Sequence, residues 1–196
     1  MRPRPYRLGR RRPAAEQTRS RILAATRDLL TAAEGVAGFT IDAVAQRAGV
    51  ARMTVYYQFK SKGGLVEGLF DWLAEAGGML QLPLAFQSPD PHAALDRFIL
   101  TFVRFWASDR LVLRRLRALA ATDPELEPVF HARDERRREG LRVLVGRLSP
   151  PRDAVELVDV LHALTSFEFF DALSQEGRSP DDVAALVQRL VRTSIT

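Results

Sequence analysis

The sequence predicts an all-α protein of about nine helices, in which a three-helix domain with a helix-turn-helix precedes a larger helical domain. Apolar residues recur three or four positions apart along most of the chain, whereas strand-like alternation never extends beyond a few residues. Glycines and prolines separate the amphipathic stretches, as expected where helices end. We therefore expect a disordered basic arm at residues 1–17, a helix-turn-helix domain at 18–64 and a second domain at 65–196.

The helix-turn-helix itself is predicted from a cap, a glycine and two short apolar patterns. Thr40 is a favourable N-cap for a helix that carries Val44 and Ala48 on one face. Gly49 follows where that helix must stop, because glycine enters the left-handed cap conformation without a Cβ penalty. The apolar pattern then resumes on a second short helix that ends at Phe59.

The other helices follow from the same signals. Proline directly after a capping residue opens several of them, since the first helical position needs no backbone N–H. Residues 79–90 contain two prolines and are expected to form a connection. The segment 152–175 is apolar nearly all round, so we expect it to be buried on every side, within the chain or against a partner chain. The remaining helices are expected at 18–33, 61–76, 91–106, 109–121, 124–148 and from 180 onward.

The second helix of the helix-turn-helix is polar in a way that suits DNA. It carries Arg52, Thr54, Tyr56, Tyr57 and Gln58, whose side chains can hydrogen-bond phosphates or base edges. Such a helix fits the DNA major groove when a tight turn joins it to its predecessor. The competing interpretation is an ordinary helical core, where Ala-Gly turns and adjacent tyrosines also occur.

The charge distribution favours the DNA interpretation. Residues 1–66 hold 13 basic and 4 acidic side chains, a net charge of +9, whereas residues 67–196 hold 16 basic and 20 acidic, a net charge of −4. The positive charge thus lies with the predicted DNA-binding segment, as a phosphate-binding surface requires. Much of it lies in the arm, which is either a DNA-backbone or minor-groove contact or a solvated tail. The arm arginines are Arg2, Arg4, Arg7, Arg10, Arg11 and Arg12.

Composition excludes several other classes of protein. The chain has no cysteine, which rules out disulfides and thiolate metal sites. No apolar run reaches the roughly 18 residues of a spanning helix, and no apolar segment follows the basic N-terminus as in a signal peptide. We therefore expect a soluble intracellular protein that has no membrane partner and needs no cofactor.

The order of these elements resembles the tetracycline-repressor (TetR) family of bacterial transcriptional regulators. The resemblance is specific over about residues 18–70, including the segment VARMTVYYQFKSK, and looser beyond it. It implies a ligand-responsive repressor that binds a near-palindromic operator as a homodimer. It also implies a location in the bacterial cytoplasm, in association with the nucleoid. By position it implies contacts with double-stranded DNA from Thr40, Arg52, Met53, Thr54, Tyr56, Tyr57, Gln58 and Lys62.

The sequence departs from the family pattern at three places. Ala51 stands where the family prefers a Ser or Thr cap, which costs the recognition helix about 1 kcal/mol. Met53 replaces a common glycine and presents an apolar side chain to the groove. Gly63 and Gly64 replace the acidic first turn that usually follows Lys62. These departures affect the pattern of contacts and leave the binding mode unchanged.

The resemblance also assigns residues 65–196 to effector binding and dimerisation. The effector is an unknown, largely apolar small molecule, and the last two helices of each subunit form the dimer interface. We expect Phe98, Phe102 and Trp106 either to line the effector cavity with Phe167 or to form ordinary core. The candidate dimer residues are Leu161, Phe169, Leu173, Val187 and Leu190.

His162 and Glu168 interrupt the apolar segment 152–175 and complete the candidate ligand site. A buried carboxylate needs a partner, which would be a ligand cation or an arginine such as Arg104 or Arg114. No two of the three histidines have metal-ligand spacing.

Three alternatives to a ligand-responsive repressor remain at this point. An enzyme is disfavoured, because the chain has no nucleophile elbow, phosphate-cradling loop or His-carboxylate motif. A DNA-binding regulator without an effector has the same sequence signals as a ligand-responsive one. A helical interaction module without DNA affinity is disfavoured by the +9 charge of residues 1–66.

Overall fold

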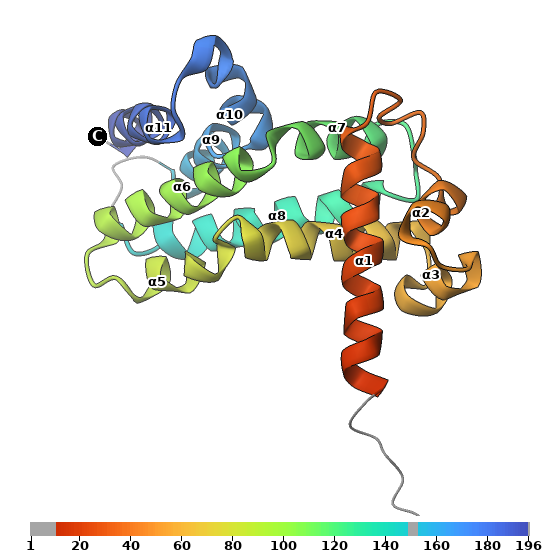
Figure 1. Ribbon diagram of the computed structural model, residues 1–196. Helices are drawn as coiled ribbons and strands as arrows, with labels where there is room; N and C mark the ends of the chain where they lie inside the picture. The colour runs from red at the N-terminus through yellow and green to blue at the C-terminus, as the bar shows by residue number, and fades with distance from the viewer. Residues whose placement is uncertain (1–10, 149–152, 196) are drawn as a thin grey trace, which may run out of the picture. The chain divides into compact units, whose positions relative to one another are not determined.

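The computed structural model is all-α and describes residues 11–148 and 153–195, with no strand among them (Figure 1). It divides into two compact units, residues 1–69 and 70–196, and the boundary falls within one helix, α4. The α-helices are α1 (Arg11–Thr31), α2 (Ile41–Ala48), α3 (Arg52–Phe59), α4 (Lys62–Ala76), α5 (Leu82–Gln87), α6 (Pro91–Ser108), α7 (Arg110–Ala120), α8 (Glu127–Val145), α9 (Ala154–Leu164), α10 (Phe167–Leu173) and α11 (Pro180–Ile195), with short 3₁₀ turns η2 (Met79–Gln81) and η3 (Gln175–Gly177).

The first unit is a small helical domain built around α2. Helix α1 packs against α2, and α2 packs against α3 (Figure 1). Its core consists of side chains that the apolar stripes predicted, together with Phe39 from the loop before α2, which is buried as an anchor between the helices. The largest fully buried side chains of this unit are Ile22, Leu30, Leu65 and Leu69.

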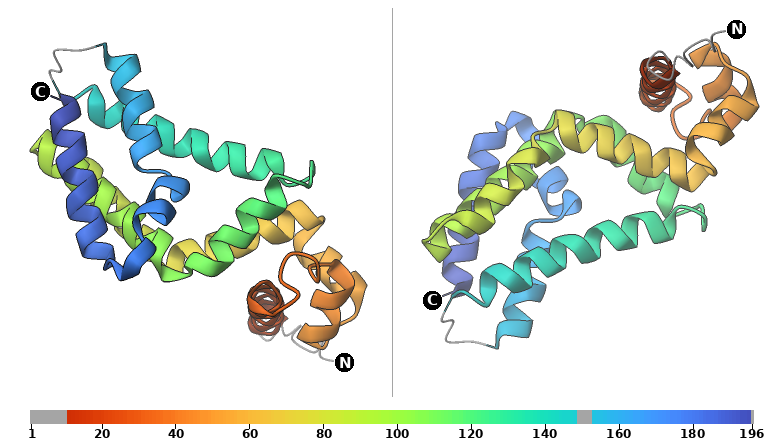
Figure 2. Two further views of the ribbon diagram at one scale, coloured as in Figure 1. Left: turned by 90° about the horizontal axis from the view of Figure 1, so that it is seen from above. Right: turned by 90° about the horizontal axis from the view of Figure 1, so that it is seen from below.

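The second unit is organised around α6. Helices α5 and α11 pack against α6, and α9 packs against both α8 and α11. Both views of Figure 2 show α11 lying against α6. Helix α6 contributes several large aromatic side chains to the core, and they are buried, namely Phe98, Phe102, Phe105 and Trp106.

Helix α1 begins earlier than predicted. It starts at Arg11 and not near Thr18, so the last seven residues of the predicted disordered arm are helical. Pro13 is compatible with this start, because it lies in the first turn, where backbone N–H groups have no partner within the helix. The arm arginines up to Arg10 lie outside the described residues.

The structure describes eleven α-helices, two more than predicted, for two separate reasons. The predicted connection 79–90 contains the short helix α5, opened by Pro83 in its first turn. The predicted single helix 152–175 breaks at Thr165 and Ser166, where the Ser166 hydroxyl caps α10 by accepting the Phe169 N–H at 3.1 Å.

Side chains from other helices satisfy the backbone groups that this break frees. Trp106 Nε1 donates to the Thr165 carbonyl at 3.1 Å, and Arg137 donates to the His162 carbonyl. Within the single chain this segment is not buried on every side, and its burial against a partner chain stays a prediction. Val155 and Val160 of α9 are exposed, since α9 packs on α8 and α11 through its opposite face.

In the described part of the chain, no helix combines the length and hydropathy needed to cross a bilayer.

Candidate nucleic-acid interface and ligand cavity

The turn between α2 and α3 has the geometry that the sequence predicted. The Thr40 hydroxyl accepts the Ala43 N–H at 3.1 Å and so caps α2. Gly49 has φ 63°, in the left-handed region, and the Val50 N–H closes the turn onto the Ala45 carbonyl at 3.0 Å. This closure fixes the direction in which α3 leaves α2.

Helix α3 presents one face to the core and the opposite face to solvent. Val55 and Phe59 are buried. At 100° per residue, Met53 and Tyr57 lie on the opposite side of the helix, and they are 72% and 77% exposed. Together they give the outward face of α3 an exposed, partly apolar surface. Thr54 and Gln58 are half-buried beside them.

Arg52 connects the two helices of the motif. Its Nη1 lies 2.9 Å from Asp42 Oδ2 on α2, and its Nη2 donates to the Tyr56 hydroxyl at 3.4 Å. The hydrogen bond to Tyr56 and the charge of Asp42 raise the pKa of the Arg52 guanidinium. Arg52 and Asp42 are both exposed, so the pair orients the arginine and adds little stability. A DNA phosphate would have to compete with Asp42 for this side chain.

The junction of α3 and α4 explains one departure from the family pattern. A Cβ on Gly64 would lie 2.0 Å from the Phe59 carbonyl oxygen, so the start of α4 approaches the end of α3 too closely for any other residue. Ser61 caps α4 by accepting the Gly64 N–H at 3.0 Å. Lys62 opens α4 with its Nζ 5.3 Å from the centre of the Phe39 ring. Lys60 between the helices has φ 70°.

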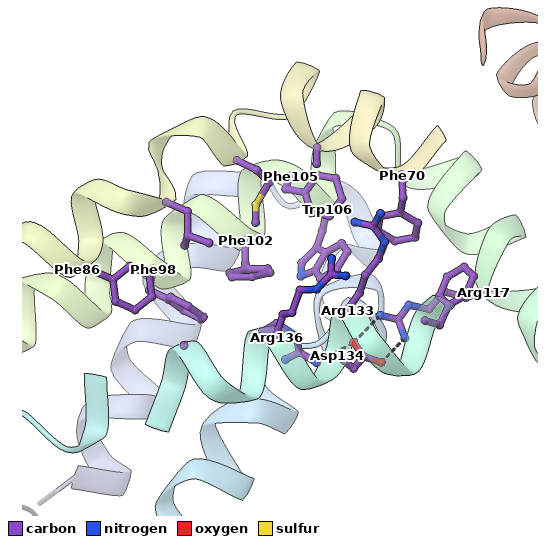
Figure 3. Close-up of a pocket in the computed structure, with 16 residues that line it drawn as sticks. Phe70, Phe86, Phe98, Phe102, Phe105, Trp106, Arg117, Arg133, Asp134 and Arg136 are labelled. Atoms are coloured by element: carbon purple, nitrogen blue, oxygen red, sulfur yellow. Dashed lines mark hydrogen bonds and ion pairs between the residues drawn. The ribbon is translucent and has the colours of Figure 1, made fainter. Parts of the chain in front are cut away.

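The second unit contains a cavity of about 240 Å³ between α4, α5, α6, α7 and α8 (Figure 3). Three of the candidate ligand residues, Phe98, Phe102 and Trp106, line it in a row along α6. The ring centres of Phe98 and Phe102 are 4.7 Å apart, and those of Phe102 and Trp106 are 5.8 Å apart. The other apolar lining residues are Phe70, Ala74, Met79, Leu82, Phe86, Phe105, Phe130 and Gly140.

The other three candidate ligand residues do not line this cavity. Phe167 packs behind it, with its ring centre 5.7 Å from that of Trp106. Glu168 is exposed, and its partner is Arg117 at 3.1 Å, not Arg104 or Arg114. His162 faces α8, where Nε2 lies 3.2 Å from the Asp134 carbonyl. Phe167 and Glu168 follow the break after α9, which the continuous helix in the prediction did not include, whereas His162 precedes the break and faces α8.

The surroundings of His162 favour its neutral form. Burial lowers its pKa, and the positive charges of Arg137 and Arg138 lower it further. Because Arg138 is a donor 3.3 Å from Nδ1, that nitrogen accepts and Nε2 carries the proton toward the Asp134 carbonyl.

Sequence reasoning missed the polar wall of the cavity, which consists of Arg117, Arg133, Asp134, Arg136 and Arg137. A signal for it was present on α8. Phe130, Leu141 and Leu144 form the buried stripe of this helix, and Arg137 occupies the intervening position of the same stripe. An arginine in a core position is seldom placed there without a partner.

The structure separates the candidate dimer residues into two groups. Leu161 and Val187 are buried within the monomer, so they cannot form a surface for a partner chain. They face the core where α9 and α11 pack against each other. Phe169 and Leu173 are half-buried, and Leu190 is 38% exposed.

Comparisons with known proteins agree with this geometry. Residues 22–69 match the family model described as bacterial regulatory proteins, tetR family. No curated protein sequence matches the chain. Among solved structures, NalD of Pseudomonas aeruginosa, the secondary repressor of the MexAB-OprM multidrug efflux pump, is 22% identical with a TM-score of 0.74, over 93% of this chain and 98% of NalD.

Two further solved structures are similar to a comparable degree. A TetR-family transcriptional regulator from Rhodococcus sp. is 19% identical with a TM-score of 0.73, over 92% of this chain and 100% of the other. A transcriptional regulator from Saccharomonospora viridis, solved in complex with choline, is 17% identical with a TM-score of 0.69, over 92% and 98% of the two chains. At these identities the likeness establishes a shared fold.

The family model covers the helix-turn-helix with the second half of α1 and the first half of α4, and the shared fold extends over nine tenths of the chain. Residues 22–69 therefore form a tetR-family DNA-binding domain, and the chain as a whole has the fold of these solved regulators.

Proposed function

We propose that this protein is a dimeric, ligand-responsive repressor that reads a near-palindromic operator with α3. The observation that carries the proposal is the outward face of α3, where Met53 and Tyr57 are largely exposed opposite the buried Val55 and Phe59. This face belongs to a segment, residues 1–66, with a net charge of +9. An exposed short helix with that charge suits the major groove of DNA.

The proposal assigns different tasks to the residues of the interface. Met53 and Tyr57 meet base edges, with Met53 placed to contact a thymine methyl group. Thr40 and Lys62, at the starts of α2 and α4, meet phosphates, because helix N-termini also direct backbone N–H groups outward. Tyr56 and Arg52 support this surface through their mutual hydrogen bond.

A gel shift on DNA from upstream of the protein's own gene, at two salt concentrations, tests this assignment. We expect Met53→Ala and Tyr57→Ala each to weaken specific binding about tenfold while leaving binding to scrambled DNA nearly unchanged. Leu80→Ala is the matched control, because Leu80 is 71% exposed but lies in the second unit. Equal binding of the wild-type protein to specific and scrambled DNA would contradict the proposal.

Dimerisation is proposed because a near-palindromic operator needs two reading helices. Successive major grooves on one face of DNA are about 34–36 Å apart, so two copies of α3 must be held at that spacing. The exposed apolar side chains of α9 and α11, Val160 and Leu190, offer the surface for a second copy, with Phe169 and Leu173 of α10 beside them. This assignment replaces Leu161 and Val187, which are buried.

Light scattering coupled to size exclusion tests the dimer. Leu190→Glu is expected to shift the chain from dimer to monomer and to weaken operator binding, because one half-site is then lost. Val143→Glu serves as the control, since Val143 is a similarly exposed valine on α8. A wild-type chain that runs as a monomer at micromolar concentration would refute this part of the proposal.

Ligand control is proposed to act through α4. Phe70 and Ala74 from the second half of this helix line the cavity, and the first half belongs to the DNA-binding unit. A ligand that moves Phe70 thus acts on the same rigid helix that begins at Lys62. The names of the relatives are consistent with this role, as NalD is a repressor and the Saccharomonospora viridis regulator was solved with choline. A ligand must prefer the non-binding state by several kcal/mol to release the operator.

A further inference from the structure

The cavity in the second unit has two chemically different walls. Helices α5 and α6 supply an aromatic wall, in which Phe86, Phe98, Phe102 and Trp106 follow one another (Figure 3). Helices α7 and α8 supply the opposite wall, which carries four arginines and one aspartate. Four positive charges and one negative charge leave this wall with a formal net charge of +3. Two of these arginines also have acidic partners outside the cavity, Glu168 for Arg117 and Asp71 for Arg133. Among the described residues, the positive charge of this wall that has no carboxylate partner is therefore that of Arg136.

The single carboxylate of the wall is already shared. Asp134 lies 3.2 Å from Arg117 and 3.3 Å from Arg137. Burial acts to raise the pKa of Asp134, but the charges of these two arginines outweigh it and hold the pKa below its ordinary value. The other acidic partners, Glu168 on Arg117 and Asp71 on Arg133, are exposed and do not line the cavity.

Arg137 is the most buried of the four arginines, at 5% exposure. Its two terminal nitrogens are used by Asp134, the His162 carbonyl and the Thr165 hydroxyl. Its Nε, like that of Arg117, is buried and has no hydrogen-bond acceptor among the described residues. Burial lowers the pKa of the Arg137 guanidinium, and Arg117 lowers it further against the attraction of Asp134. A buried donor without an acceptor calls for a ligand or a water there.

Arg136 is the arginine best placed to meet a ligand. In Figure 3 it rises from α8 toward Phe102 and Trp106. Within the described part of the chain it makes no hydrogen bond or ion pair, and it is more exposed than Arg137. Its guanidinium can therefore turn toward an anion in the cavity without giving up an existing partner.

We propose that the effector of this regulator is a compact aromatic or similarly apolar carboxylate, with its apolar body against the α6 aromatic wall and its carboxylate on Arg136 and the buried edge of Arg137. Guanidinium groups bind carboxylates through paired, charge-assisted hydrogen bonds. The inference rests on the proposed ligand response and adds the chemical class of the ligand.

The volume of the cavity and the positive charge of its wall narrow the chemical class of the ligand. A cavity of roughly 150 Å³ accommodates benzene, so about 240 Å³ has room for one or two fused rings and a carboxylate. A cationic ligand is disfavoured, because it would meet a wall that is already positive. This chain therefore differs in ligand charge from its structural relative that was solved with choline, which is a cation.

Isothermal titration of the full chain without DNA tests the proposal, with three probes that share one ring system: 2-naphthoate, 2-naphthamide and 2-naphthylmethylammonium. At pH 7.5 we expect the carboxylate to bind about tenfold to a hundredfold more tightly than the neutral amide, as for a charge-assisted hydrogen bond. The ammonium compound should bind most weakly.

Arg136→Gln and Arg142→Gln assign the effect to the cavity. Both residues lie on α8, but only Arg136 lines the cavity, and Arg142 pairs with Glu139 outside it. Arg136→Gln should lower 2-naphthoate affinity about tenfold and leave 2-naphthamide affinity unchanged, whereas Arg142→Gln should change neither. Arg137 is left intact because its hydrogen bonds hold α9 at its break.

Three outcomes would overturn the inference: amide or ammonium binding as tightly as the carboxylate, a carboxylate preference that survives Arg136→Gln, or no binding by 2-naphthoate and a series of aryl and alkyl carboxylates of similar size. Because binding is measured without DNA, these outcomes are separate from those of the gel shift. If a carboxylate binds but leaves operator affinity unchanged, the proposed ligand response is refuted, whereas the proposed carboxylate site is supported.

Discussion

Gly64→Ala offers a stringent test of how the reading helix is held. The substitution adds one methyl group at the start of α4, and that carbon would lie 2.0 Å from the Phe59 carbonyl oxygen at the end of α3. Carbon and carbonyl oxygen come no closer than about 3.3 Å in ordinary contacts, so the two backbones must separate by about 1.3 Å. Gly64 has no positive φ, so the clash alone opposes alanine.

The magnitude follows from two opposing effects. Alanine favours the helical state by about 1 kcal/mol over glycine. Overpacking of a folded interior costs about 1–3 kcal/mol, and more where backbone has to move. We therefore expect Gly64→Ala to lower the free energy of unfolding of residues 1–69 by about 1–3 kcal/mol and to weaken operator binding, although Gly64 lies outside the proposed contact face.

Hydrogen exchange by mass spectrometry measures this locally. Peptides covering α3 and the start of α4 should exchange about fivefold to a hundredfold faster in the variant. Gly68→Ala is the matched comparison on the same helix, since its Cβ would meet the Phe59 ring at 2.8 Å and the flexible end of Arg19 at 2.9 Å. It should cause a smaller change. A Gly64→Ala protein that exchanges as slowly as the wild type, or more slowly, would refute the reasoning.

Three further predictions concern pH, a partly buried ion pair and the basic arm. Because the pKa of His162 is lowered by folding, the unfolded chain binds the extra proton, and stability should fall as pH drops through about 6.5; urea unfolding at pH 7.5 and 5.5 should show this fall, and His162→Gln should reduce it. Asp171→Asn should lower stability by about 1–3 kcal/mol at pH 7, because Asp171 pairs with Arg110 at 2.5 Å and Arg114 at 2.7 Å. The two arginines hold the pKa of Asp171 below its ordinary value, so this ion pair stabilises the fold at neutral pH and the stabilisation is lost as pH falls below about 4. Thermal melts in which Asp171→Asn lowers stability as much at pH 3 as at pH 7 would contradict this. Replacing Arg2 and Arg4 by alanine should lower affinity for specific and scrambled DNA alike and flatten the salt dependence of binding in gel shifts by about 0.9 per lost phosphate contact; a loss confined to the specific sequence would argue for base readout by the arm.

The sequence was sufficient where the signals are local. Thr40 and Gly49 set the ends of α2 through contacts that span only a few residues, so the chain around them carries all the information needed. The apolar positions of α3 likewise fix its inner face at Val55 and Phe59, and thereby the outer face at Tyr57. Helical periodicity relates each of these positions to its neighbours without reference to the rest of the fold.

Tertiary structure decided the features that depend on distant partners. The sequence pattern of 152–175 predicts one helix, but the structure breaks it. Trp106 donates to the Thr165 carbonyl and Arg137 donates to the His162 carbonyl, which lowers the free-energy cost of the break. Phe167 and Glu168 follow this break and do not line the cavity. Periodicity alone marks α9 and α11 as apolar, but only their packing determines that Leu161 faces the core while Leu190 faces solvent.

The positive wall of the cavity has the same origin. Along the sequence, the arginines of α8 look like a solvated basic run, because charge and helical spacing say nothing about which face another helix will cover. Packing places Arg137 inside and leaves Arg136 beside the aromatic row of α6. The sequence by itself thus determined most of the helices and the outward face of α3, which local backbone and capping preferences specify. The cavity and its charge arose only where helices distant in sequence met.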